Sequence, residues 1–210
     1  MLDFSVETIK EEKKETQKKE VKARVFQRTT KTQTRRAFSE VTLRELLPHN
    51  LEKGQSYHVI SGGDVDSLSF LKHILYEQNL DYCLFSTWCM ASEDVALFGE
   101  WIEQGKIKRL DCYVGEIFPN SYSAQFNELK KIIDKTDGRI CVFRNHAKLY
   151  AGFGEKFDFA IESSANINTN PRTEQTTITV CSELAKFYKS FYDDIKSFDR
   201  SYEDWRSYNA

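Results

Sequence analysis

Apolar residues follow two alternating spacings along most of this chain. Short apolar runs typical of strands occupy residues 56–61, 81–87, 107–115 and 139–143. The segments between them carry apolar side chains at helical spacing, over residues 66–78, 92–105 and 121–138. Strands that alternate regularly with helices are typical of an α/β fold, because each helix can cover the sheet that its neighbouring strands build.

The pattern changes after residue 145. Residues 146–153 and 156–163 are both strand-like, and glycines with Glu155 between them predict a hairpin. A further strand is expected over residues 174–182 and a final helix over 184–198. The whole order predicts a mixed β-sheet flanked by helices, that is, an α/β/α sandwich.

The first 36 residues differ from the rest in composition. They hold eleven Lys and Arg against six acidic residues, whereas the remainder holds 19 basic and 26 acidic residues. We expect a charged arm, helical or disordered, over residues 1–36 and one domain over 37–210. Ser39 is expected to cap a short helix that Pro48 ends. The arm is either a solubilising tail or a nucleic-acid contact made by Lys18, Lys19, Lys22, Arg24, Arg28, Arg35 and Arg36.

The remaining composition narrows the class of protein. The five cysteines are odd in number and form no CxxC pair, which favours buried free thiols over a disulfide or metal role. No apolar leader and no apolar run long enough to cross a bilayer stands in the sequence. These features predict a cytoplasmic protein.

The segment "SGGDVDS", residues 61–67, lies between a predicted strand and a predicted helix. It resembles the phosphate loop of the PP-loop ATP pyrophosphatases, with one extra residue before Asp66 and Ser67. Two carboxylates in the loop disfavour a bound anion. The favoured interpretation is a turn in which Asp66 caps the following helix.

The segment "RNHAKLY", residues 144–150, carries the candidate chemistry. Residues two apart in a strand share one face, so His146 and Lys148 are expected side by side. Imidazole has an ordinary pKa of about 6.5, and its neutral form can attack phosphorus. An ammonium group beside it can hold the phosphoryl oxygens as charge develops in the transition state.

Polar residues downstream extend this pattern. Ser164 and Asn166 follow the next predicted strand, and Glu174 precedes the one after it. With His146 and Lys148 they resemble the HxK and GSxN motifs of the phospholipase D superfamily. The resemblance covers roughly residues 56–198 and is strongest to small bacterial nucleases that carry a single motif, which form half of an active site. Two positions depart from the motifs, because Phe153 stands for an Asp and Ser163 for a Gly.

The resemblance implies a phospholipase D-like half domain with catalytic residues His146, Lys148, Ser164, Asn166 and Glu174. It implies that one histidine attacks phosphorus, that Glu174 orients it, and that a second histidine protonates the leaving oxygen. None of the other histidines has a lysine two residues on; they are His49, His58 and His73. A homodimer that pairs two copies of His146 is therefore expected, with no metal and no cofactor.

These observations predict a metal-independent phosphodiesterase that forms a phosphohistidine, acts on DNA or RNA, and completes its site by dimerisation. Three alternatives stay open. The first is a catalytically impaired module that only binds nucleic acid, with Phe153 marking the loss of activity. The second is a phospholipid headgroup hydrolase or transferase. The third is an ATP-dependent adenylating enzyme built on the loop at Asp66.

Overall fold

A computed structural model describes the backbone of residues 31–38 and all atoms of residues 39–168 and 171–210. The predicted order of strands and helices from residue 56 onward is confirmed, with one additional short helix, α5. The elements are α2 (Lys31–Leu46), β1 (Ser56–Ser61), α3 (Ser67–Glu77), β2 (Leu80–Thr87), α4 (Ser92–Glu103), β3 (Leu110–Gly115), α5 (Phe118–Ser121), α6 (Ser123–Ile133), β4 (Ile140–Phe143), β5 (Leu149–Gly154), β6 (Phe159–Ser163), β7 (Glu174–Thr179) and α7 (Ser182–Asp193).

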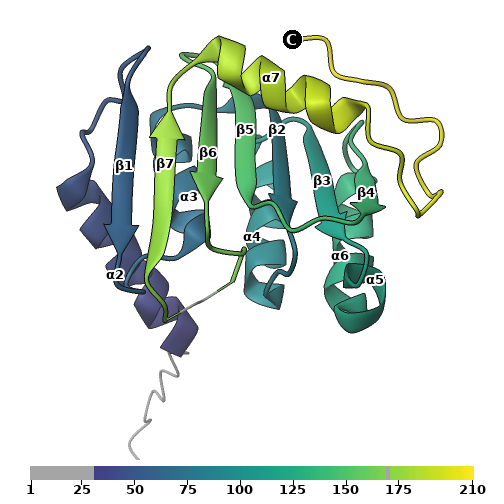
Figure 1. Ribbon diagram of the computed structural model, residues 1–210, viewed down its shortest axis with the longest axis horizontal. Coiled ribbons are helices and arrows are strands. Elements are labelled where there is room, and N and C mark those ends of the chain that lie inside the picture. Colours follow the sequence, from purple (N-terminus) through teal and green to yellow (C-terminus); the bar gives the residue numbers. More distant parts are fainter. Residues whose placement is uncertain (1–30, 169–170) are drawn as a thin grey trace, which may run out of the picture. The chain divides into compact units, whose positions relative to one another are not determined.

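The strands of the described residues form one seven-stranded mixed sheet in the order β1-β7-β6-β5-β2-β3-β4 (Figure 1). β2, β3 and β4 are parallel, since helices connect them and return the chain to the same end of the sheet. β5, β6, β7 and β1 pair antiparallel, and β5 joins the two halves by pairing antiparallel with β2. The mixed α/β sheet predicted from the sequence is therefore confirmed.

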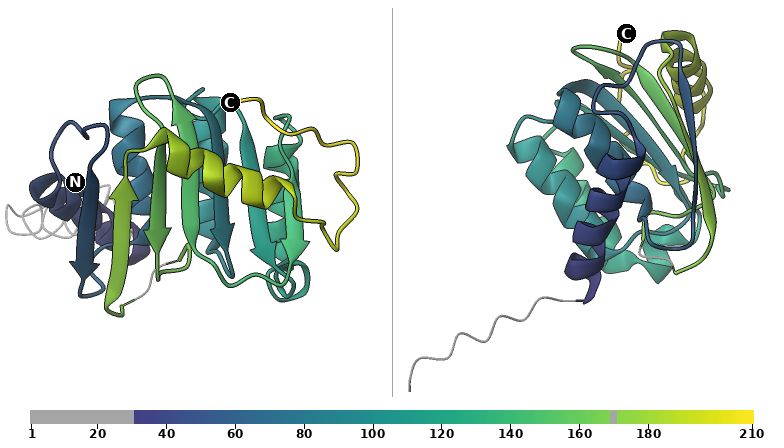
Figure 2. Two further views of the ribbon diagram at one scale, coloured as in Figure 1. Left: turned by 45° about the horizontal axis from the view of Figure 1, so that its top comes forward. Right: turned by 90° about the vertical axis from the view of Figure 1, so that its left-hand side faces the viewer.

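Helices cover both faces of the sheet, which makes the α/β/α layers visible from the side (Figure 2). β2 shows how the sequence produces this arrangement, because successive side chains of a strand point to opposite faces. Cys83 and Phe85 pack into the larger core, with α2, α3, α4 and α6. Tyr82 and Leu84 pack into the smaller core under α7. A central strand buried on both faces needs continuous apolar sequence, as β2 has.

The predicted start of the first helix is wrong. Ser39 does not cap a helix but lies buried in the middle of α2. Its hydroxyl donates a hydrogen bond to the carbonyl oxygen of Asp64 at 2.8 Å and accepts one from the backbone N–H of Asp66 at 3.2 Å. Ser39 therefore makes a tertiary contact between α2 and the loop before α3 and does not cap a helix.

The loop of residues 61–67 packs against the segment that precedes β7. Gly63 has a positive φ of 92°, and a Cβ there would lie 2.5 Å from the carbonyl carbon of Pro171. Asp66 takes the N-cap position of α3 as predicted, but its side chain makes no capping hydrogen bond. The glycine thus serves a close approach between two backbones.

Phe153 is a core residue. It lies in β5, is 6% exposed, and its ring centroid is 5.9 Å from that of Tyr82 and 6.1 Å from that of Tyr208. The side chain at this position therefore stabilises the packing under α7.

The cysteines are free thiols, and four of them are buried while Cys181 is partly exposed. Among the helices of the described residues, none combines the length and the apolar character that a membrane span requires.

Candidate functional site

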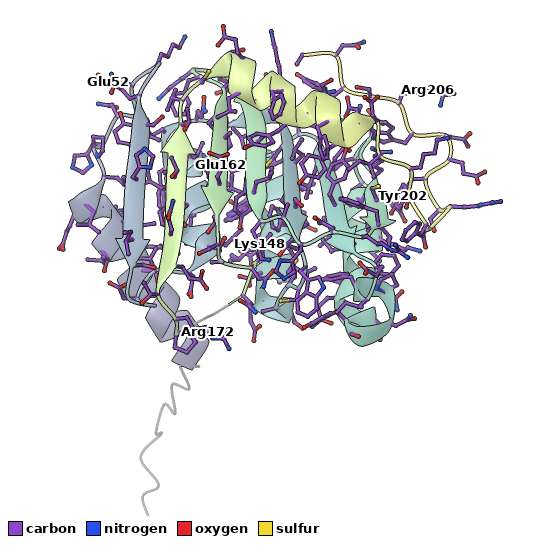
Figure 3. The ribbon with its side chains drawn as sticks, in the orientation of Figure 1. Glu52, Lys148, Glu162, Arg172, Tyr202 and Arg206 are labelled. Carbon is purple, nitrogen blue, oxygen red and sulfur yellow. The ribbon has the colours of Figure 1, made fainter. Side chains whose placement is uncertain are left out.

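The candidate residues gather where β2 and β6 end and where β5 and β7 begin. Lys148 immediately precedes β5, and its carbonyl oxygen accepts a hydrogen bond from the backbone N–H of Ser163 at 3.0 Å. Figure 3 shows Lys148 and Arg172 toward the end of the sheet that lies away from α7. In α/β sheets, ligands bind outside the carboxyl ends of the strands, so this position suits a site.

His146 and Lys148 lie in a loop, so the prediction that both stand in a strand is wrong. β5 begins only at Leu149. The two side chains nevertheless meet, because the Lys148 Nζ lies 2.9 Å from His146 Nδ1 and 3.3 Å from its Nε2. The same Nζ donates to the carbonyl oxygen of His146 at 2.6 Å. The ammonium group thus lies directly beside an exposed imidazole.

Asn145 holds this loop in place. It is 6% exposed, and its Nδ2 donates to Ser86 Oγ at 2.9 Å and to the carbonyl oxygen of Tyr113 at 3.0 Å. Its Oδ1 accepts from the backbone N–H of Ala147 at 3.0 Å. One side chain therefore ties the residues around His146 to the ends of β2 and β3. The sequence analysis did not identify Asn145 as a candidate. The one feature that could have indicated it is its position, as a polar residue directly before His146.

Ser164 and Glu174 form a second contact pair. The Ser164 hydroxyl donates to the Glu174 carboxylate, and the backbone N–H of Gln175 donates to Ser164 Oγ at 3.0 Å. The backbone N–H of Ser164 also donates to the carbonyl oxygen of Gln175 at 2.9 Å. The serine is thus held by the start of β7. The role of Glu174 in orienting His146 stays a prediction.

Asn166 connects this pair to the end of β2. Its Oδ1 accepts hydrogen bonds from the backbone N–H of Trp88 at 3.2 Å and from Thr87 Oγ1 at 3.4 Å. The indole of Trp88 in turn lies against the imidazole of His146, with ring centroids 5.7 Å apart. Trp88 therefore links the Asn166 loop to the His146 loop, and the sequence contained no pattern that singled it out.

Burial and charge act together on Lys148. Its partial burial lowers the pKa of its amine, while the nearby groups Cys89 and Glu174 oppose that shift. Burial likewise raises the pKa of the Cys89 thiol, which a hydrogen bond with Tyr122 and the charge of Lys148 oppose. A partly desolvated cation attracts an anion more strongly than a fully hydrated one. The site is therefore suited to a negatively charged group such as a phosphate.

The predicted residues fall into three groups. His146 with Lys148, and Ser164 with Glu174, are in direct contact, and Asn166 reaches His146 through Trp88. Within residues 39–168 and 171–210, no hydrogen bond, ion pair or ring contact joins His146 to another histidine. Most predicted nucleic-acid contacts fall outside the described residues, at Lys18, Lys19, Lys22, Arg24 and Arg28, while Arg35 and Arg36 lie in the first turns of α2.

A metal site is not evident in the part of the chain that the structure describes, since no three His, Cys, Asp or Glu side chains there group suitably. The ammonium group of Lys148 contacts His146, the hydroxyl of Ser164 contacts the carboxylate of Glu174, and the carboxamide of Asn166 contacts the backbone just after β2. Of these groups, the ammonium, the hydroxyl and the carboxamide N–H can donate hydrogen bonds to a phosphoryl oxygen, whereas the carboxylate can only accept them.

No protein-family model and no curated protein matches this chain. A solved structure of a polyphosphate kinase from Porphyromonas gingivalis does match, with a TM-score of 0.51 and 12% sequence identity over 69% of this chain. The match covers 27% of that kinase, so this chain spans about a quarter of its length. At this identity the likeness shows a shared fold.

The assignment to the single-motif phospholipase D nucleases is therefore wrong. It rested on five polar residues in short motifs, and no family model supports it. The polyphosphate kinase that shares the fold is named as a kinase and is much longer than this chain. Short polar motifs recur in unrelated chains, because a few loop residues place few constraints on the surrounding sequence.

We expect Asn145→Ala to lower the free energy of unfolding by about 2–3 kcal/mol, because the carbonyl oxygen of Tyr113 and the hydroxyl of Ser86 would lose a buried partner. Urea denaturation measures the change. Asn79→Ala is the matched control, since Asn79 donates only to the exposed carboxylate of Glu155 and its loss should change stability by under about 0.5 kcal/mol. Equal effects of the two substitutions would contradict the anchoring role.

Proposed function

We propose that this chain is a phosphoryl-transfer enzyme in which His146 is the nucleophile. The observation that carries the proposal is the contact between the exposed imidazole of His146 and the Lys148 ammonium group, 2.9 Å from Nδ1 to Nζ, at the ends of the strands. A nucleophile and a cation at this spacing can address one phosphorus centre and its oxygens at the same time.

The proposed reaction has two steps. A ring nitrogen of His146 attacks phosphorus and forms a P–N bond, while the P–O bond to the leaving group breaks and a proton donor protonates the leaving oxygen. Water then loses a proton to the resulting base and attacks phosphorus, which breaks the P–N bond and frees His146. Lys148 balances the charge on the phosphoryl oxygens in both steps, and no metal is needed for that purpose.

We propose nucleic acid as the substrate. Arg172 is exposed at the same end of the sheet as Lys148. The backbone nitrogen of Arg172 lies close to Gly63. The next residue, Asp64, accepts a hydrogen bond from the hydroxyl of Ser39 in α2. Arg35 and Arg36 stand one turn before Ser39 in that helix. Cationic residues on linked segments suit a polyanion that extends beyond one phosphate.

Inorganic polyphosphate is the second candidate substrate. The observation that favours it is the fold shared with a polyphosphate kinase. Polyphosphate is a chain of phosphates joined by P–O–P bonds, so His146 would attack its phosphorus with a phosphate in place of a sugar oxygen as the leaving group.

A second copy of this chain is proposed as the proton donor. The described contacts of His146 involve no second imidazole, whereas the first step of the proposed reaction needs a nucleophile and an acid together. A two-fold axis at the site would bring a second His146 and Lys148 to the same phosphate. The alternative is a module that binds nucleic acid through a single copy of the site and does not turn it over.

We expect the purified protein to cleave single-stranded oligonucleotides in EDTA, and His146→Ala to lower the rate by at least about 1000-fold, because the nucleophile is lost. His58→Ala is the matched control, since His58 lies on β1 and contacts Thr177. Gel electrophoresis of labelled strands measures the cleavage, and a parallel assay uses polyphosphate. Cleavage that survives His146→Ala would overturn the proposal.

We expect sedimentation equilibrium to show a dimer at micromolar concentration. Activity should then fall more steeply than protein concentration on dilution, because each site needs two chains. A monomer with full activity per chain would contradict the dimeric site, and a monomer that binds without turnover would favour the binding module.

We expect activity to fall as the pH rises and Lys148 loses its proton, and we expect this fall at a lower pH than for a lysine with an ordinary pKa. Burial lowers the pKa of Lys148, so its charged form is lost earlier as pH rises. Lys148→Arg should move the alkaline limb of kcat/KM to higher pH, since arginine stays protonated. Lys53→Arg, in the exposed turn before β1, should leave the profile unchanged. An unshifted limb in Lys148→Arg would show that another group titrates.

A further inference from the structure

Trp88 is the aromatic residue at the candidate site that the two cores do not explain. It directly follows β2, is partly exposed, and belongs to neither the core under α7 nor the larger core on the other face. A partly exposed indole outside the cores leaves some of a large apolar surface in contact with water. Its exposed part, beside His146, is therefore open to a ligand.

The structure holds the indole in one place. The backbone N–H of Trp88 donates to Asn166 Oδ1 at 3.2 Å. A Cβ added to Gly115, at the end of β3, would lie 2.8 Å from Trp88 Cδ1 and 3.4 Å from Nε1. The missing side chain at Gly115 thus makes the space in which the indole lies. An aromatic ring fixed in this way loses little conformational entropy when a flat ligand stacks on it.

The indole also stands at a fixed relation to the proposed nucleophile. Its centroid is 5.7 Å from the imidazole of His146, and the two ring planes meet at 52°. A phosphate bound against His146 and Lys148 would lie within about one nucleotide of this ring, because the indole centroid is only 5.7 Å from that of the imidazole. The base attached to that phosphate can therefore reach the indole.

We propose that Trp88 is a base-stacking residue that makes the His146 site select single-stranded nucleic acid over substrates without bases. The inference rests on the proposed function and adds that the protein recognises the bases of the substrate as well as its phosphates. Stacking on an aromatic ring tolerates any base sequence, since every base has a π-face. Paired bases are stacked on one another, so a duplex would have to open before a base could reach Trp88.

Base stacking on Trp88 would distinguish the two candidate substrates. Polyphosphate has phosphates and no bases, so it would gain from Lys148 and gain nothing from Trp88. An oligonucleotide with tetrahydrofuran residues in place of its nucleosides has the same backbone charge and likewise no bases. Comparing these substrates isolates the contribution of the indole from that of the cation.

The test compares wild type with Trp88→Leu and Trp88→Phe on a normal single strand and on the tetrahydrofuran strand of equal length. Leucine keeps apolar contact with Gly115 but has no aromatic face, whereas phenylalanine keeps one. We expect Trp88→Leu to raise KM for the normal strand roughly 5- to 150-fold, with kcat and the tetrahydrofuran strand nearly unaffected. Trp88→Phe should restore most of the loss. Phe187→Ala, exposed on α7, is the control that should change neither substrate.

An equal loss on both strands, seen mainly in kcat, would overturn the proposal, because it would mean that Trp88 only positions His146. Tryptophan fluorescence provides a readout that does not depend on turnover. In a His146→Asn background the normal strand should quench emission and the tetrahydrofuran strand should not, and Trp88→Phe should remove the quenching. If the wild-type protein cleaves neither strand, the proposed catalysis is wrong. The quenching experiment still tests whether bases stack on Trp88.

Discussion

The hydrogen bonds of Asn145 hold the arrangement on which the candidate site depends. The chain leaves β4 at one edge of the sheet and must pass the ends of β3 and β2 before it enters β5. Asn145 bonds to Ser86 of β2 and to Tyr113 of β3 along that path. A buried carboxamide that lost these partners would be strongly unfavourable. The crossing therefore has one preferred path, and His146 lies on it.

This crossing also marks the change from parallel to antiparallel strands. β5 pairs antiparallel with β2, so the chain enters β5 at the end where β2 and β6 leave the sheet. Residues far apart in sequence meet there, with Trp88 after β2, Lys148 before β5 and Ser164 after β6. The topology makes this point suitable for a ligand, since loops from several strands converge where the strand direction changes.

The order of elements could be predicted because it depends on local spacing of apolar residues. Leu71 and Ile74 repeat at helical spacing, and β2 is apolar on both faces, so both elements bury side chains wherever the chain places them. Ser39 shows the limit of this reasoning. A serine before apolar residues at helical spacing predicts a helix start, but the hydroxyl of Ser39 donates a hydrogen bond to the carbonyl oxygen of Asp64, 25 residues away. Local preferences of serine cannot reveal a partner that distant.

The family assignment failed for a related reason. His146 contacts Lys148 and Ser164 contacts Glu174, but spacing in sequence does not distinguish a shared ancestor from a few polar loop residues. Phe153 illustrates the point, because its place in the motif predicts an acid while the structure packs it against Tyr82 and Tyr208. Its role is packing, which only its neighbours across the sheet reveal.

The sequence by itself determined the order of the main strands and helices from residue 56 onward and that His146 and Lys148 would be close, because periodicity and a separation of two residues are local properties. Only the tertiary structure decided that this pair lies in a loop and that Asn145 anchors it. The same is true of Trp88, whose indole reaches His146 across a space that Gly115 leaves open. These contacts join β2, β3 and the residues before β5, and no local pattern encodes which strand ends will meet.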